Sequence, residues 1–221
     1  HNLNQVALEC FIDEVANAAG KDPIQYRLDM LDMGATKHVW SGLSAGVPVG
    51  PRMKRALEEV RAKSGWGKKM PAGKGMGVAV TESYNTVIAM VAEVTVSSNY
   101  DVTLDKVTAV VDGGTLVHPD QALAQIQSTI NFGQSAVLWG EITVKNGGIE
   151  QTNFDMYRVA RMNEAPRVLD IHFIRSDSSP GGMGEPAMAG IGAGIGNAIF
   201  AACGKRCRTL PFTPENIKGS A

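Results

Sequence analysis

Apolar residues in the first third of the chain recur at spacings of three and four, the pattern of helices with one buried face. This pattern predicts a helix from Leu3 to Ala18 and a second helix that opens at Asp22-Pro23 and is closed by Gly34. A third helix is predicted from Arg52 to Lys63. The stretch from Trp40 to Pro51 is rich in Gly, Ser and Pro, which favours a loop.

A basic connector with Pro and Gly, residues 68–75, separates this helical pattern from a different one. Beyond it, β-branched residues are frequent and apolar positions partly alternate, as in strands. The predicted strands are residues 76–80, 87–96, 102–112 and 168–174, with a polar break at 82–86 and a short hairpin around Asn146-Gly147. The predicted helices are residues 119–138 and 187–202, the second apolar on all sides and therefore buried.

The expected fold class is α+β, with a helical segment over residues 1–68 and an α+β domain over residues 69–221. The formal net charge of −1, from 21 basic and 22 acidic residues, lacks the basic excess of nucleic-acid-binding proteins. No run of about 18 apolar residues is recognised, so no membrane-spanning segment is expected.

Three cysteines form an odd set that does not indicate a disulfide framework. Cys203 and Cys207 are interpreted as ordinary thiols. The alternative, a metal site, lacks a nearby His and the two-residue spacing of structural zinc ligands, so no metal ligands are predicted.

The densest glycine run covers residues 181–196 and contains seven glycines and one charged side chain, Glu185. Glycine at this density indicates positive φ angles or a backbone that closely approaches another group. A lone carboxylate in a tight apolar loop is expected to be desolvated and could serve as a general base. The alternative is a glycine-rich linker with a solvated Glu. A dinucleotide-binding fingerprint is disfavoured because the preceding predicted strand ends near Arg175, well before the glycines that it would need.

The predicted helix over residues 119–138 begins with a polar face. Gln121, Gln125 and Ser128 share that face by the three-and-four rule, and His118 precedes the helix. Amides and a hydroxyl on one face can hydrogen-bond a polar ligand without adding charge. The alternative is an ordinary solvated face.

Several segments, in order along the chain, resemble the C-terminal part of the large subunit of the molybdenum hydroxylases, the xanthine dehydrogenase and aldehyde oxidase class. The segments that carry the resemblance are Asp112-Gly113-Gly114, His118-Pro119-Asp120, Ala124-Gln125, Arg161 to Val168, Gly181 to Pro186 and Asn197 to Arg206. Phe11 to Glu14 and Ala19 to Pro23 add a likeness to the subgroup that includes the β subunit of isoquinoline 1-oxidoreductase and periplasmic aldehyde dehydrogenases.

This resemblance implies a molybdopterin-binding domain that holds molybdenum on molybdopterin, in the cytosine dinucleotide form. It implies that Glu185 is the catalytic base of a reaction that hydroxylates N-heterocyclic aromatics or oxidises aldehydes with oxygen from water. The residues implied to contact the cofactor are Gln125, Gln121, Ser128, Ser83 and Gly184. Those implied to contact the small-molecule substrate are Tyr84 and Met188.

The resemblance also implies partners: the remaining part of a longer large subunit, a small subunit with [2Fe-2S] clusters, and a cytochrome c acceptor. It places the protein in a bacterial periplasm or cytoplasm without choosing between them. As an isolated portion, the chain is expected to be inactive and to expose apolar surface.

Two departures from the family pattern leave an alternative open. Gly-Glu-Pro is followed here by Ala187-Met188-Ala189-Gly190, and the helix continues after Gln125 as Gln127-Ser128-Thr129, where the family usually has Glu-Gly-Gly. The alternative function is a non-catalytic scaffold or assembly subunit that retains the fold.

Overall fold

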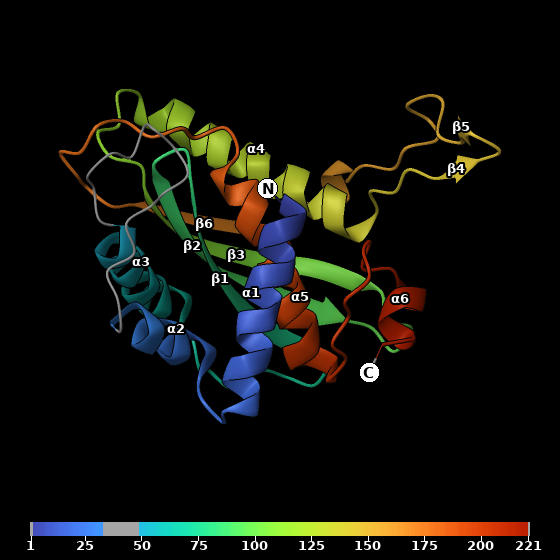
Figure 1. Cartoon of the computed structure of the whole chain (residues 1–221), viewed down its shortest axis with the longest axis horizontal. Helices are drawn as coiled ribbons and strands as arrows, with labels where there is room; N and C mark the ends of the chain where they lie inside the picture. The colour runs from blue at the N-terminus through green and yellow to red at the C-terminus, as the bar shows by residue number, and fades with distance from the viewer. Residues whose placement is uncertain (1, 33–48, 221) are drawn as a thin grey trace.

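A computed structural model describes residues 2–32 and 49–220, and it confirms the α+β class (Figure 1). The helices are α1 (Asn2–Ala18), α2 (Pro23–Asp32), α3 (Val49–Ser64), α4 (Pro119–Leu138), α5 (Pro186–Cys203) and α6 (Pro214–Lys218). The strands are β1 (Lys74–Ser83), β2 (Thr86–Val96), β3 (Val102–Asp112), β4 (Val144–Lys145), β5 (Gly148–Ile149) and β6 (Val168–Phe173).

The main sheet has the strand order β1-β2-β3-β6, with β6 parallel to β3 and the other neighbours antiparallel. Alternate residues of β2 point to opposite faces, and both faces are covered. Ile88 and Met90 join a core with α1, α4 and α5, whereas Ala89 and Val91 join a core with α2 and α3. Helices on both faces bury nearly every residue of β2, which explains why its apolar alternation in the sequence is only partial.

The first hairpin differs from its prediction. The predicted polar break at 82–86 is mostly strand, because β1 continues to Ser83 and β2 starts at Thr86. Only Tyr84 and Asn85 form the turn, and both have positive φ, 52° and 63°, as a two-residue hairpin turn of type I′ requires. The physical reason is local pairing: the Asn85 N–H donates to Glu82 Oε1 at 2.9 Å, so the polar side chains are used inside the hairpin.

Helix α3 begins earlier than predicted. Val49, Gly50 and Pro51, which were assigned to the loop, form its first turn, where a proline is tolerated because the first N–H groups have no partner within the helix. The remainder of that predicted loop and the predicted stop at Gly34 lie outside the described residues. The N-cap at Asp22 is confirmed, since the Gln25 N–H donates to Asp22 Oδ1 at 2.9 Å.

Helix α5 is the buried centre of the fold, as its composition predicts. Gly75 and Gly77 of β1 lie directly against its backbone: a Cβ on Gly77 would lie 2.2 Å from the amide nitrogen of Ala198 and from the carbonyl oxygen of Gly194. Because Gly75 and Gly77 of β1 and Gly194 of α5 have no side chains, the strand and the helix touch along their main chains.

The same helix corrects the expectation about membranes. Its 18 residues are long and apolar enough to cross a bilayer by length and composition, so an apolar stretch of this length does exist in the chain. Within the described fold, however, 72% of this stretch is buried against the sheet and neighbouring helices. Burial in the core accounts for its apolar composition.

Helices α1, α2 and α3 pack closely on the main sheet and α5, and the boundary at residues 68/69 remains a prediction. Glu9 of α1 is buried, where its Oε2 accepts from Arg27 Nε at 3.0 Å and from the Val80 N–H of β1 at 2.9 Å. Asp13 pairs with Arg206 at 2.9 Å, and Arg206 donates to Asn197 of α5 at 3.2 Å. These buried polar groups pair with one another and join α1 to both the sheet and α5.

Three free cysteines occur in the fold, and Cys203 and Cys207 donate to the carbonyl oxygens of Ile199 and Thr209. Burial raises the pKa of the Cys10 thiol to about 12, with Asp13 and Glu9 raising it further and Arg206 opposing them.

We therefore expect Cys10 to react with iodoacetamide at pH 8 at least about tenfold more slowly in the folded protein than in the unfolded one, because only the thiolate is the nucleophile. The raised pKa stabilises the fold below the unfolded thiol's value of 9.0, and this contribution is lost as the pH rises towards 12. Mass spectrometry of peptides after timed labelling measures the rate; equal rates in urea and in buffer would contradict the assignment.

Candidate functional site

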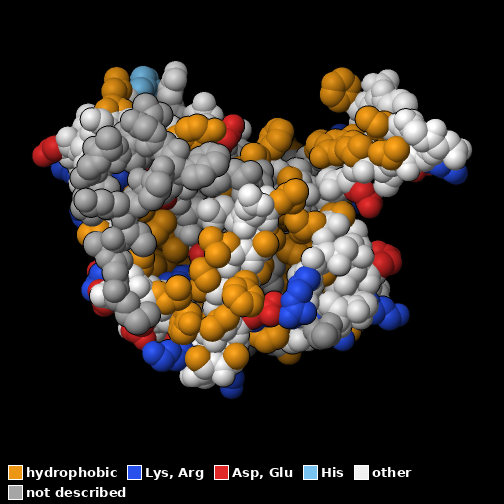
Figure 2. Space-filling view, viewed as in Figure 1, with side chains coloured by type: hydrophobic (Ala, Val, Ile, Leu, Met, Phe, Trp, Pro, Cys, Tyr) orange, Lys and Arg blue, Asp and Glu red, His pale blue; other side chains and the backbone are white. Residues whose placement is uncertain are grey.

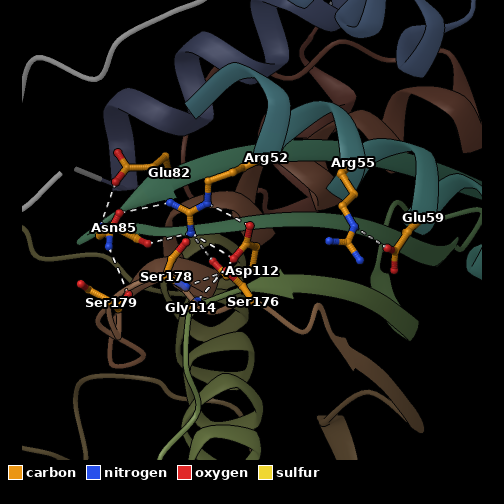
Figure 3. Close-up of polar contacts among 10 residues, drawn as sticks. All are labelled: Arg52, Arg55, Glu59, Glu82, Asn85, Asp112, Gly114, Ser176, Ser178 and Ser179. Atoms are coloured by element: carbon orange, nitrogen blue, oxygen red, sulfur yellow. Dashed lines mark hydrogen bonds and ion pairs between the residues drawn. The ribbon is translucent and has the colours of Figure 1, made fainter. Parts of the chain in front are cut away.

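Four segments meet at one end of the main sheet: the β1–β2 turn, the end of β3, the start of α4 and the glycine loop before α5 (Figure 3). The loop is bonded to the other segments by its main chain. The Gly182 N–H donates to the carbonyl oxygen of Tyr84 at 2.8 Å, and the Gly181 N–H donates to that of Gly113 at 2.9 Å. The Thr115 N–H donates to the carbonyl oxygen of Ser178 at 2.9 Å, so the loop is anchored over residues 178–182.

Glycines permit this close docking. A Cβ on Gly181 would lie 2.3 Å from Thr86 Oγ1, and one on Gly114 would lie 2.2 Å from the carbonyl oxygen of Ser179. Gly114 also has φ +70°, a conformation that side chains rarely allow. The glycines therefore serve close approach, which contradicts the glycine-rich-linker alternative, although the solvated Glu185 of that alternative is found in this chain.

Beneath the loop lies a buried polar network that the sequence reasoning missed. Arg52 of α3 donates through Nε to Asp112 Oδ2 at 2.9 Å and through Nη1 to Asn85 Oδ1 at 3.1 Å (Figure 3). The Arg52 and Asp112 side chains are 10% and 6% exposed. Asp112, a carboxylate at a strand end directly before Gly113-Gly114, could be singled out in the sequence as a candidate polar site. Its partner Arg52 could not, because it lies 60 residues away in sequence.

Glu185 occupies the N-cap position of α5, directly before Pro186, and its side chain does not cap the helix. It is exposed, so the expectation of a desolvated carboxylate is wrong for this chain by itself. The reason is that the glycine loop turns its inner side to the β1–β2 turn and its outer side to solvent. Gly184 is exposed beside it, with nothing within 4 Å of the position that a Cβ would take.

A hollow of about 240 Å³ lies between the start of α4 and the glycine loop. Gln121 and Gln125 line it from α4, together with His118, and Gly181 and Met183 line it from the loop. His118 caps the helix, accepting the Gln121 N–H on Nδ1 at 3.2 Å. The structure thus brings the two predicted glutamines and the glycine loop together around one open space.

The other predicted residues lie apart from this hollow. Ser128, further along α4, lines a separate apolar groove with Phe132 and Met162. Ser83 is buried at the end of β1, whereas Tyr84 is 51% exposed at the turn beneath Gly182. Met188, in the first turn of α5, packs its backbone against Gly133 of α4.

A hollow lined by glycines and neutral amides, with the Glu185 carboxylate at the start of α5 on the same loop, is an arrangement typical of a ligand-binding site. A family model described as "Molybdopterin cofactor-binding domain" matches residues 29–166. The chain belongs to this family, the molybdopterin-binding domain of molybdenum hydroxylase large subunits.

Two curated proteins align over nearly the whole chain. A protein of Gluconacetobacter polyoxogenes named "Membrane-bound aldehyde dehydrogenase [pyrroloquinoline-quinone]" is 37% identical over 95% of this chain and 28% of its own length. "Isoquinoline 1-oxidoreductase subunit beta" of Brevundimonas diminuta is 28% identical over 94% of this chain and 25% of its own length. The chain thus spans about a quarter of the length of these relatives.

A solved structure with the same fold is the aldehyde oxidoreductase from Desulfovibrio gigas, with a TM-score of 0.74 over 98% of this chain and 40% of that one. At 14% identity this likeness concerns the fold alone.

Proposed function

We propose that this chain forms one wall of the cofactor site of a molybdenum hydroxylase that hydroxylates N-heterocyclic aromatics or oxidises aldehydes, with Glu185 as the general base. The observation that carries the proposal is the meeting of Gln121, Gln125 and the Glu185 loop at one end of the sheet, in a chain of the molybdopterin-binding family.

The residues around the hollow fit a pterin cofactor. Gln121 and Gln125 are exposed amides, each of which offers two N–H donors and a carbonyl acceptor to phosphate oxygens or a ring edge. The open space beside Gly184 lets a bulky group approach the main chain. When bound, a molybdopterin-cytosine-dinucleotide cofactor would supply the two-electron redox chemistry.

Glu185 would receive the proton that leaves water-derived oxygen as that oxygen is transferred to the substrate. Its position at the start of a rigid, buried helix supports this role, because the carboxylate is held at a fixed place while remaining accessible. Tyr84, exposed on the adjacent turn, and Met188, which follows Glu185 on the first turn of α5, would contact the substrate.

Exposed apolar side chains support further partners. Figure 2 shows such side chains along α1 and on the arm that carries β4 and β5. They include Leu3, Leu8, Phe11, Ile142, Val144, Ile149 and Phe154. We propose that the remaining part of a large subunit covers these surfaces, desolvates Glu185 and completes the site. We also propose a separate subunit with [2Fe-2S] clusters, which passes electrons to an acceptor such as cytochrome c.

The test is the molybdenum and cytosine nucleotide content of the complete enzyme and of a Gln125→Leu variant. Stoichiometric molybdenum is expected in the wild type, and the variant should retain the metal about 10- to 100-fold less tightly because it loses hydrogen bonds to a charged cofactor. Gln127→Leu, on another side of the same helix, is the matched control and should retain molybdenum as the wild type does.

The alternative, a scaffold subunit without catalysis, rests on the departures at 127–129 and 187–190. A native complex that contains neither molybdenum nor pterin at this chain would support it and would contradict the cofactor proposal.

A further inference from the structure

We infer that Arg52 is a positioning residue that holds the Glu185 loop in place through the β1–β2 turn and the end of β3. The inference rests on the proposed role of Glu185 and adds to it a residue of the opposite sheet face. Arg52 lies on α3, the helix that covers the face of the sheet away from α4 and α5 (Figures 1 and 3).

One guanidinium joins two segments. Nε and Nη2 of Arg52 donate to the two carboxylate oxygens of Asp112 at 2.9 and 3.1 Å, and Nη2 also donates to the Asp112 carbonyl at 2.9 Å. On the other side, Nη1 and Nη2 donate to Oδ1 and the carbonyl oxygen of Asn85 at 3.1 and 3.0 Å. The guanidinium of Arg52 therefore links the β1–β2 turn to the end of β3.

The glycine loop rests on these two segments. Asn85 Nδ2 donates to the carbonyl oxygen of Ser179 at 3.4 Å, and the Gly182 N–H donates to Tyr84 beside it. At the end of β3, the Gly113 carbonyl accepts the Gly181 N–H. The loop is thus bonded to the two segments that Arg52 joins, the β1–β2 turn and the end of β3. These bonds are made by loop residues 179–182, a few residues before Glu185.

The β1–β2 turn needs these hydrogen bonds from Arg52 because its backbone is strained. Tyr84 and Asn85 both have positive φ, which is uncommon for a residue with a large side chain such as tyrosine. Two hydrogen bonds from Arg52 to Asn85, and one from the Asn85 N–H to Glu82, hold this conformation. Asn85 is itself only 6% exposed, so water does not readily replace these partners.

Arginine suits this position better than lysine. Its planar group presents several donors in fixed directions, and here they reach a carboxylate and an amide at once. A lysine ammonium keeps the charge opposite Asp112 but cannot serve both segments with the same geometry.

The experiment uses the complete enzyme complex with Arg52→Met/Asp112→Asn, which removes both buried charges, and with Arg52→Lys. The control is Arg55→Met, one turn along the same helix, which breaks only the exposed pair between Arg55 and Glu59 (Figure 3). Hydrogen exchange of the peptide spanning residues 178–184 should become about tenfold faster in the double variant, less so in Arg52→Lys, and stay unchanged in the control.

Kinetics then separate positioning from general damage. In the double variant we expect kcat to fall about 10- to 100-fold with the molybdenum content unchanged, because the base is misplaced while Gln121 and Gln125 still hold the cofactor. When Arg52→Met/Asp112→Asn is combined with Glu185→Gln, turnover should fall no further than in Glu185→Gln alone, because Arg52 acts through the Glu185 carboxylate.

The outcomes are distinguishable. Unchanged loop exchange in the double variant, or a full further loss in the Glu185→Gln background, overturns the inference about Arg52. Wild-type turnover in Glu185→Gln overturns the proposed function, whatever the exchange of the loop shows.

Discussion

Replacing Glu185 with glutamine in the complete enzyme should lower kcat by about 10²- to 10⁴-fold, the range that a general base contributes. The amide has nearly the same shape as the carboxylate and cannot accept a proton at neutral pH, so the substitution tests the chemistry with little change in packing. Because the Glu185 side chain is exposed and does not cap α5, its loss should leave the fold intact.

Steady-state kinetics with an N-heterocycle and an aldehyde, together with molybdenum analysis, measure this effect. Molybdenum should remain at the wild-type level, which separates loss of the base from loss of the cofactor. Glu215→Gln, which changes another exposed carboxylate on α6, is the control and should turn over normally. A Glu185→Gln enzyme with wild-type kcat and full molybdenum would exclude this residue as the base.

Placing a single methyl group on Gly77 should have the largest effect on stability. The new Cβ would lie 2.2 Å from backbone atoms of Ala198 and Gly194, and neither the strand nor the helix can yield like a flexible side chain. We expect Gly77→Ala to lower the free energy of unfolding by about 3 kcal/mol or more, at the upper end of the usual range for overpacking.

Chemical denaturation followed by tryptophan fluorescence measures this change, and loss of soluble protein would be its extreme form. Gly148→Ala in the β4–β5 hairpin is the control, because its Cβ would make only an ordinary contact of 3.7 Å with Lys145. That variant should unfold within about 0.5 kcal/mol of the wild type, as surface substitutions usually do. Equal stability of the two variants would show that β1 and α5 can separate without cost.

Most of the fold could be predicted because its elements carry local signals. The predicted bounds of the helix over 119–138 match α4, and the strand over 102–112 matches β3. Errors arose where tertiary partners outweigh local composition. The residues around Ser83 look like a break because they are polar, yet Glu82, Ser83 and Thr86 are extended because they pair in the β1–β2 hairpin.

The candidate site was predictable in part for the same reason. Gln121 and Gln125 lie on one helix face, so their spacing alone places them together. The density of glycines in the loop before α5 indicated a close approach of its backbone to other segments. The position of Arg52 under that loop depends on how α3 crosses the sheet, which no spacing in the sequence encodes. The exposure of Glu185 depends on what covers the loop, and no segment within the described residues does so.

The main-chain contact between β1 and α5 has a consequence for motion. Gly75 and Gly77 bring the strand so close to the helix that α5 cannot slide along its axis or roll on the sheet without collision. Glu185 directly precedes the first turn of that helix, and its loop is held by the two segments that Arg52 joins, so helix and loop together make this carboxylate a fixed reference point. Any opening or closing of the site during a catalytic cycle must be carried by the segments that face this carboxylate, while the wall described here stays still.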